Sequence, residues 1–206
     1  MHQADLGGAG PPSLWDIVVR VSHWGIAIVV LANEAMTRGG SAAHVWFGWA
    51  GLGLLGLRMV WGLVGSPAAR FSAFPPNPRQ AMTHLRDVLA GRPMAHASHN
   101  PAGALMVYAL WMSLAVLIGT GIAMSGPDPF AVADREAVVN SNDWSGLDTE
   151  TGEGGGGKMV KTVHETMANL LLLLISLHLA GVVVEGVAMR RNLVTPMLFG
   201  GGRSDK

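Results

Sequence analysis

The stretch from Val163 to Arg191 constrains the fold more than any other, because it is long and apolar enough to cross a lipid bilayer. A membrane-spanning helix needs about 20 apolar residues. Within this stretch His164 and His178 are 14 residues apart (178 − 164). At about 3.6 residues per turn and about 1.5 Å rise per residue, both imidazoles leave the same helix face, roughly 21 Å apart along the axis. An imidazole in hydrocarbon is costly when unpartnered, so each predicts a partner elsewhere in the chain.

Three further apolar segments accompany this one. Half of the 206 residues are hydrophobic and 14% are charged, which is typical of a small membrane bundle rather than a soluble domain. The expected helices cover about 14–36, 44–64, 101–124 and 164–189. We therefore expect an all-α fold, a transmembrane four-helix bundle that forms a single domain over 1–206. Residues 78–89 predict a further helix at the surface, and residues 125–163 an acidic, glycine-rich outer loop.

The distribution of Lys and Arg predicts the orientation of the bundle, because these residues are enriched in cytoplasmic loops. Four spans place both chain ends on one side, together with the 66–100 loop. That side carries eight Lys and Arg residues: Arg70, Arg79, Arg86, Arg92, Arg190, Arg191, Arg203 and Lys206. The other side carries four: Arg38, Arg135, Lys158 and Lys161. Both termini are therefore predicted to be cytoplasmic. A formal net charge of zero argues against a nucleic-acid partner.

Depth within the membrane pairs four histidines. His44 and His164 each open a helix at the outer surface. His23 precedes the outer end of the first helix, near Thr37, by 14 residues (37 − 23), and His178 lies as far inward of His164. Both inner histidines are thus roughly 21 Å from the outer level. The sequence predicts an outer pair, His44 with His164, and an inner pair, His23 with His178.

Haem iron is a suitable partner for such pairs, since a neutral imidazole is its usual nitrogen ligand. The chain has no cysteine, which excludes iron–sulfur clusters and covalent haem attachment through C-x-x-C-H. We therefore expect two non-covalent haem groups between facing helices. Gly48 and Gly51 share the helix face of His44 and could leave room for a macrocycle, or could let helices pack closely. Gly53, Gly56 and Gly62 fit close packing better.

Two arginines and a third-helix histidine complete the candidate site. Arg20 lies one turn before His23, and Arg58 lies 14 residues after His44, at the inner level. A buried arginine needs an anion, so both are candidates to pair with haem propionates, with snorkelling to the surface as the alternative. His99 could line a quinone pocket, relay protons or contact a propionate, or could be a helix-end residue exposed to water. For His84 and His96 solvated surface is expected.

Several short motifs lie in order along the four predicted helices. They are W-D-I-V-V-R-V-S-H-W (15–24), H-V-W-F-G-W (44–49) with R-M-V-W-G (58–62), H-N-P-A-G (99–103), and V-H-E-T-M-A-N (163–169) with L-H-L-A-G (177–181). With them, the chain from Leu14 to Leu198 resembles the bacterial cytochrome b561 family, which includes the b-type subunits of nickel–iron hydrogenases. The resemblance implies that His23, His44, His164 and His178 bind two haems b. The long loop at 125–163 looks like an individual elaboration.

The same resemblance implies an electron carrier of the bacterial inner membrane, working between quinone (ubiquinone or menaquinone) and a periplasmic cytochrome c or a dehydrogenase subunit. It could be a quinol/quinone oxidoreductase subunit, and a superoxide oxidase coupled to quinone uses the same scaffold. A histidine-lined transporter of divalent metal is an alternative, although such sites favour carboxylates beside the histidines. A non-catalytic membrane anchor for a soluble enzyme is a third hypothesis. A homodimer in lipid remains open.

Overall fold

Four long helices dominate the computed structural model, which describes residues 15–90, 100–140, 155–188, 190 and 192–200. They are α1 (Ile17–Met36), α2 (Ala42–Val64), α4 (Pro101–Ser125) and α6 (Gly155–Ala188). The shorter elements are η1 (Phe71–Ala73), α3 (Pro78–Leu89), α5 (Pro129–Asn140) and α7 (Val194–Phe199). All four long helices are long and apolar enough to cross a membrane. The predicted all-α bundle with four membrane helices is confirmed, as is the helix at 78–89.

The first three membrane helices begin at residues that satisfy their free N–H groups. Asp16 accepts from the Val19 N–H at 2.9 Å, and the Ser41 hydroxyl accepts from the His44 N–H at 3.3 Å. Asn100 caps α4 by accepting from the Gly103 N–H, just before Pro101 in the first turn. Such side chains replace the helical partners that the first N–H groups lack. Capping therefore sets where α1, α2 and α4 start.

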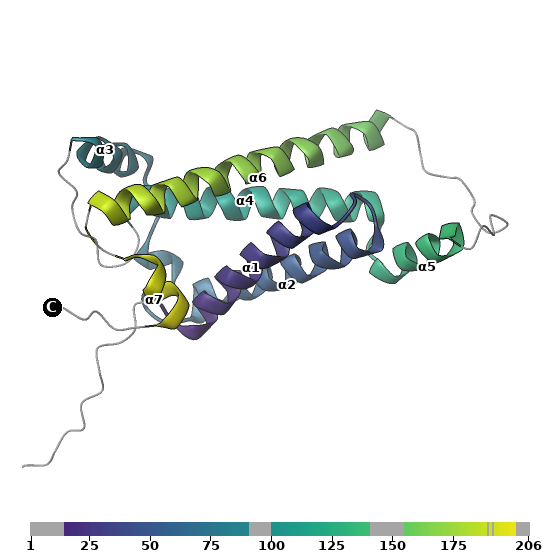
Figure 1. The fold of residues 1–206 in the computed structure, drawn as a ribbon, viewed down its shortest axis with the longest axis horizontal. Coiled ribbons are helices and arrows are strands. Elements are labelled where there is room, and N and C mark those ends of the chain that lie inside the picture. The colour runs from purple at the N-terminus through teal and green to yellow at the C-terminus, as the bar shows by residue number, and fades with distance from the viewer. Residues whose placement is uncertain (1–14, 91–99, 141–154, 189, 191, 201–206) are drawn as a thin grey trace, which may run out of the picture.

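The bundle consists of two helix pairs. Helices α1 and α2 pack side by side, and so do α4 and α6 (Figure 1). Glycine allows the first of these contacts, because a Cβ on Gly25 would lie 3.0 Å from Leu54 and one on Gly51 would lie 3.6 Å from Val29. The two pairs meet in a core of α2, α4 and α6 side chains: Leu55, Leu114, Ile118 and Leu171.

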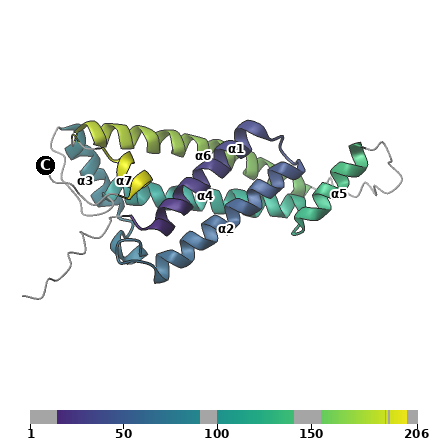
Figure 2. The same ribbon diagram turned by 60° about the horizontal axis from the view of Figure 1, so that its bottom comes forward.

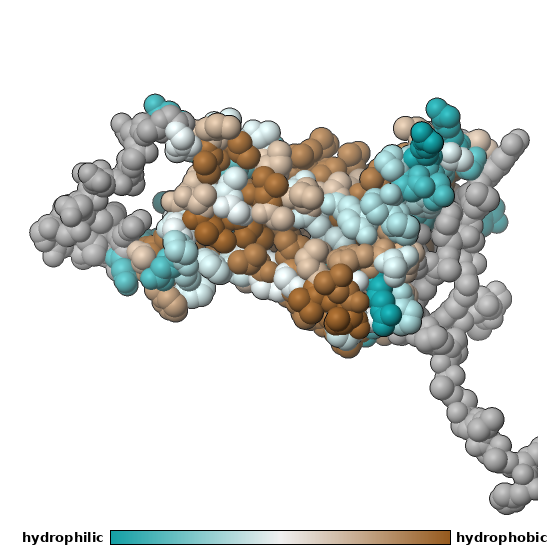
Figure 3. Space-filling view, turned by 180° about the vertical axis from the view of Figure 1, so that it is seen from behind, coloured by the Kyte–Doolittle hydropathy of each residue, from teal (hydrophilic) through white to brown (hydrophobic). Residues whose placement is uncertain are grey.

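The outer faces of the helices are apolar. Large side chains of α6 such as Leu173, Leu179, Val183 and Val187 are more than half exposed. Figure 3 shows hydrophobic residues over the middle of one face, with hydrophilic residues gathered toward its ends. A soluble protein rarely exposes so much contiguous apolar surface. The arrangement fits a molecule whose middle lies in lipid, as the multi-pass topology requires.

The two ends of the bundle carry different short elements. In both ribbon views α3 and α7 lie at one end and α5 at the other (Figures 1 and 2). Helix α7 is fixed to the start of α1, because Arg20 Nη1 donates to the Leu198 carbonyl and Trp24 Nε1 to the Met197 carbonyl, both at 3.2 Å. The start of α1 and α7 therefore share one end of the bundle. That this end faces the cytoplasm stays a prediction.

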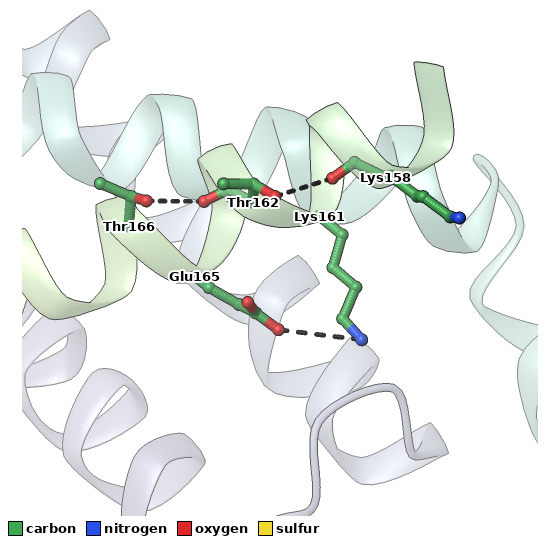
Figure 4. A network of polar contacts seen from close by, with 5 residues as sticks. All are labelled: Lys158, Lys161, Thr162, Glu165 and Thr166. Atoms are coloured by element: carbon green, nitrogen blue, oxygen red, sulfur yellow. Dashed lines mark hydrogen bonds and ion pairs between the residues drawn. The ribbon is translucent and has the colours of Figure 1, made fainter. Parts of the chain in front are cut away.

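The outer connection differs from the sequence expectation of a loop over 125–163. Helix α5 occupies part of it, and α6 begins at Gly155 rather than near residue 164. Contacts with α2 hold α5 in place: the Ala42 N–H donates to Glu136 Oε2 at 2.8 Å, and the Trp46 and Phe130 rings are 5.0 Å apart. Figure 4 shows the polar first turns of α6, with an ion pair between Lys161 and Glu165 at 3.9 Å.

The amphipathic helix α3 corrects the expectation for His84. Its side chain is 5% exposed, and Ala81, one turn before it, is 3% exposed. Helix α3 packs against α4 and buries this face, whereas solvated surface was expected for His84. His96 and His99 lie outside the described residues.

An aromatic cluster joins the segment after α2 to helix α4. The ring of Phe71 is 6.4 Å from Phe74, 6.3 Å from Tyr108 and 5.8 Å from Trp111. Gly62 lies against it, since a Cβ there would be 2.2 Å from Phe71 Cζ. Close packing at Gly62 is therefore confirmed. At Gly53 and Gly56 it is wrong, because a Cβ at either would have nothing within 4 Å.

Gly62→Ala is expected to destabilise the bundle by about 1–3 kcal/mol, the usual cost of overpacking. The Phe71 ring cannot easily move aside, because the other three rings of the cluster surround it. Thermal unfolding in detergent measures the change. Gly56→Ala is the matched control and should be neutral or slightly stabilising, since its Cβ meets open space and alanine favours helix. Equal stability of the two variants would contradict the prediction.

Candidate functional site

The outer histidine pair joins α2 to α6. The ring centroids of His44 and His164 are 6.2 Å apart, with their planes at 62°. Each ring has a threonine hydroxyl beside its Nδ1 atom: Thr37 Oγ1 at 3.3 Å from His44, and Thr120 Oγ1 at 2.9 Å from His164. Residues from α2, α4 and α6, together with Thr37 directly after α1, thus meet at one level. The two rings are held at their Nδ1 edges, which leaves Nε2 of each for another partner.

The inner pair joins α1 to α6 in a different way. The ring centroids of His23 and His178 are 6.3 Å apart, with their planes at 56°. His23 Nδ1 is buried and has no hydrogen-bond partner among the residues that the structure describes. A buried polar atom of this kind calls for an explanation, and a bound ligand at this site would provide one. The Trp24 ring stands edge-on to His23 at 5.3 Å.

The two separations match what one metal ion between two imidazoles requires. A metal–imidazole bond is about 2 Å, and adding roughly 1 Å for each ring radius places the centroids of two opposed ligands about 6 Å apart. The same separation also lies within the range of aromatic rings in edge contact. The ring separation alone therefore does not indicate a metal site. The residue types and their positions add to it, because the rings form two histidine pairs, at two levels, on helices that are apolar.

Two glycines near the outer pair differ in what lies beside them: open space at Gly48 and the His164 ring at Gly121. A Cβ on Gly48, one turn after His44, would have nothing within 4 Å. A Cβ on Gly121 would lie 3.4 Å from His164 Cε1, so the His164 ring packs directly against this glycine of α4. Gly51 instead serves helix packing, since its Cβ would meet Val29 and Ile118. Of the two interpretations open for the His44 face, room for a group fits Gly48 and close packing fits Gly51.

The structure gives the two candidate arginines different surroundings. Arg58 is 5% exposed; Nη1 and Nη2 each donate to the Ala69 carbonyl at 3.3 Å, and Cζ lies 4.9 Å from the Trp111 ring centroid. Arg20 uses Nη1 for the Leu198 carbonyl, while its buried Nε has no hydrogen-bond partner among the described residues. Arg20 therefore keeps the freer donor for an anion.

The sequence analysis missed three polar groups that organise the site: Thr37, Thr120 and Asp16. Thr120 lies in a helix without charged residues, where nothing in the sequence distinguishes its hydroxyl from those of the serines. Asp16 links the start of α1 to the end of α2, because it accepts from Trp61 Nε1 at 2.9 Å and from the Ser66 hydroxyl. Burial raises the pKa of Asp16, but these hydrogen bonds and those from the backbone outweigh it and hold the pKa below its ordinary value.

The described residues offer little to a metal ion that needs several protein ligands. No group of three or more His, Cys, Asp or Glu within them is placed to hold one. Zinc sites use three or four protein ligands, whereas haem iron takes its other four nitrogens from the porphyrin and needs only two axial ligands. The two-histidine pairs fit the second chemistry.

Comparison with known proteins agrees with this interpretation. The family model described as prokaryotic cytochrome b561 matches residues 14–200. No curated protein and no solved structure matches the chain. The family match covers all four membrane helices and all four paired histidines. It indicates b-type haem and electron transfer in a membrane. The chain therefore belongs to the prokaryotic cytochrome b561 family.

Proposed function

We propose that this chain is a di-haem b cytochrome of the bacterial inner membrane. It would carry electrons between the quinone pool and a periplasmic or membrane redox partner, such as a cytochrome c or a dehydrogenase subunit. The observation that carries the proposal is the presence of two histidine pairs at two levels, with centroid separations of 6.2 and 6.3 Å. Two such sites across a bilayer suit a protein that connects one side with the other.

The side chains around each pair have distinct roles in this proposal. His44 and His164 would ligate the outer haem, and His23 and His178 the inner one. Bound haem supplies the one-electron chemistry, and the protein tunes it through axial ligands and their surroundings. Arg20 is the better candidate for an inner propionate, because its Nε is buried without a partner among the described residues. Arg58 would act as a fixed nearby cation, since its Nη1 and Nη2 both donate to the Ala69 carbonyl and hold the guanidinium in place.

The quinone site belongs to the same proposal. His99 comes directly before Asn100, whose side chain donates to Glu185 of α6. An imidazole suits proton exchange with a quinone, because it titrates near neutral pH. We therefore keep His99 as the candidate residue for ubiquinone or menaquinone.

The proposal predicts the visible spectrum of the purified full-length protein. Chain produced with haem supply and extracted in detergent should show a reducible b-type spectrum with two low-spin haems per chain. Quinol analogues should reduce it. Haem per chain is measured by the pyridine haemochrome method, and bound zinc by elemental analysis on the same sample. A colourless protein that retains zinc would instead support a divalent-metal transporter, and a single haem would contradict the di-haem assignment.

A further inference from the structure

The hydroxyl of Thr120 has more neighbours than it has hydrogens. Its Oγ1 lies 2.8 Å from the Val116 carbonyl oxygen and 2.9 Å from the Leu117 carbonyl oxygen. The same atom lies 2.9 Å from His164 Nδ1. A hydroxyl carries one hydrogen and two lone pairs, and carbonyl oxygens only accept. The single hydrogen is best placed toward the carbonyls of α4, as a threonine inside a helix commonly places it.

This count favours one tautomer of His164, with the hydrogen on Nδ1. Since the hydroxyl hydrogen points to the carbonyls, Thr120 can only accept from the imidazole. Nδ1 of His164 must then carry the ring hydrogen, which leaves the lone pair on Nε2. If Nδ1 were the acceptor, two carbonyl oxygens would lie within 2.9 Å of the hydroxyl oxygen with no hydrogen between them. Gly121 supports the same pose by leaving room at Cε1.

We propose that Thr120 is a positioning residue that holds His164 as an axial ligand through Nε2 and lowers the reduction potential of the outer haem. The proposal rests on the proposed function, since it presupposes a haem at His44 and His164. A hydrogen bond from the far nitrogen of a ligating imidazole fixes its orientation and raises its basicity. A more basic ligand favours ferric over ferrous iron, so the hydrogen bond shifts the potential downward.

The remaining histidines provide comparisons within the same molecule. Thr37 repeats the arrangement at His44, because its hydroxyl also faces the Asn33 carbonyl at 2.6 Å and Asn33 Oδ1 at 2.7 Å. Its distance to His44 Nδ1, 3.3 Å, makes it the weaker of the two. At the inner level, His23 Nδ1 has no hydrogen-bond partner among the described residues. The inner site is therefore an internal reference for any change made at Thr120.

The test compares Thr120→Val, Thr120→Ser and Thr166→Val in the full-length haem-loaded protein. Valine keeps the shape of threonine without the hydroxyl, and serine restores it. Thr166 is the matched control, because its exposed hydroxyl donates to the Thr162 carbonyl at 2.7 Å, one helix turn back (Figure 4). Thr120 makes the same contact with the Val116 carbonyl at 2.8 Å. The readouts are haem per chain, the potentiometric titration of both haems, and the low-spin ferric resonance spectrum.

Thr120→Val is expected to raise the outer potential and change the outer ferric spectrum, while the inner haem keeps its values. A tenfold loss of ferric preference corresponds to about 59 mV for one electron. Thr120→Ser and Thr166→Val should keep both potentials. The component that His44→Ala removes identifies the outer haem. Loss of the outer haem in Thr120→Val with its retention in Thr120→Ser would also support the role.

Two results would overturn the inference in distinguishable ways. If the wild-type protein carries two haems and Thr120→Val leaves both potentials unchanged, or shifts them no more than Thr166→Val does, Thr120 has only a structural role. The proposed function would then stand. If the wild-type protein binds no haem at His44 and His164, the proposed function fails and this inference fails with it.

Discussion

His178→Ala should leave a folded protein with one low-spin haem instead of two. The ring of His178 faces His23 across the inner level at 6.3 Å, and replacing it removes one of the two proposed axial ligands. The outer pair is 14 residues away along α6 (178 − 164), roughly 21 Å at helical rise. Because the two levels share no ligand, the outer haem should keep its spectrum and potential. Haem per chain and the number of components in a potentiometric titration measure the result.

The control for this variant is Ser176→Ala on the same helix. The Ser176 hydroxyl is exposed and donates to the Leu172 carbonyl at 2.9 Å, as helical serines commonly do. Its loss changes one small polar group near His178 and should leave two haems. Circular dichroism establishes that both variants keep their helices. Loss of both haems from a helical His178→Ala protein would contradict the independence of the two levels, and retention of two low-spin haems would contradict the ligand assignment.

Much of this bundle was predictable because membrane helices follow simple local rules. Long apolar runs bounded by capping residues such as Asp16 and Asn100 mark where α1 and α4 begin, whatever the rest of the chain does. The spacing of 14 residues between His164 and His178 is likewise local. It places two rings on one helix face before any tertiary contact is known. Proximity of each ring to its partner then follows from matching depth.

The features that sequence did not reveal depend on contacts between distant segments. Helix α5 lies in a stretch with acidic residues and glycines, and it is held by Glu136 at the Ala42 N–H and by Phe130 against Trp46. Neither contact has a local signature. Burial of His84 depends on α3 folding back on α4.

The role of Thr120 was hidden for a related reason. A threonine inside a helix bonds back to its own helix by default, and Thr120 does so with the Val116 and Leu117 carbonyls. Only the approach of His164 from α6 gives the hydroxyl a second role. The same holds for Arg58, whose Nη1 and Nη2 donate to the Ala69 carbonyl 11 residues further on.

Two double variants, each lacking two histidines, should differ completely in haem content. His44→Ala with His164→Ala removes both ligands of the outer pair and should leave one haem, the same number as either single variant. His44→Ala with His178→Ala removes one ligand from each pair and should leave none. Residues that act as a unit are non-additive, whereas independent sites add. The comparison is matched, because both proteins lose two imidazoles and share His44→Ala.

The opposite pairing makes the opposite prediction and is therefore excluded or established by the same measurement. If His44 shared its haem with His178, the second double variant would keep one haem and the first would keep none. The ring separations of 6.2 Å for His44 with His164 and 6.3 Å for His23 with His178 argue for the first outcome. Helical content and thermal unfolding should be recorded for both proteins. Loss of haem then counts only where the bundle remains folded, because a collapsed bundle would lose both haems whatever the pairing.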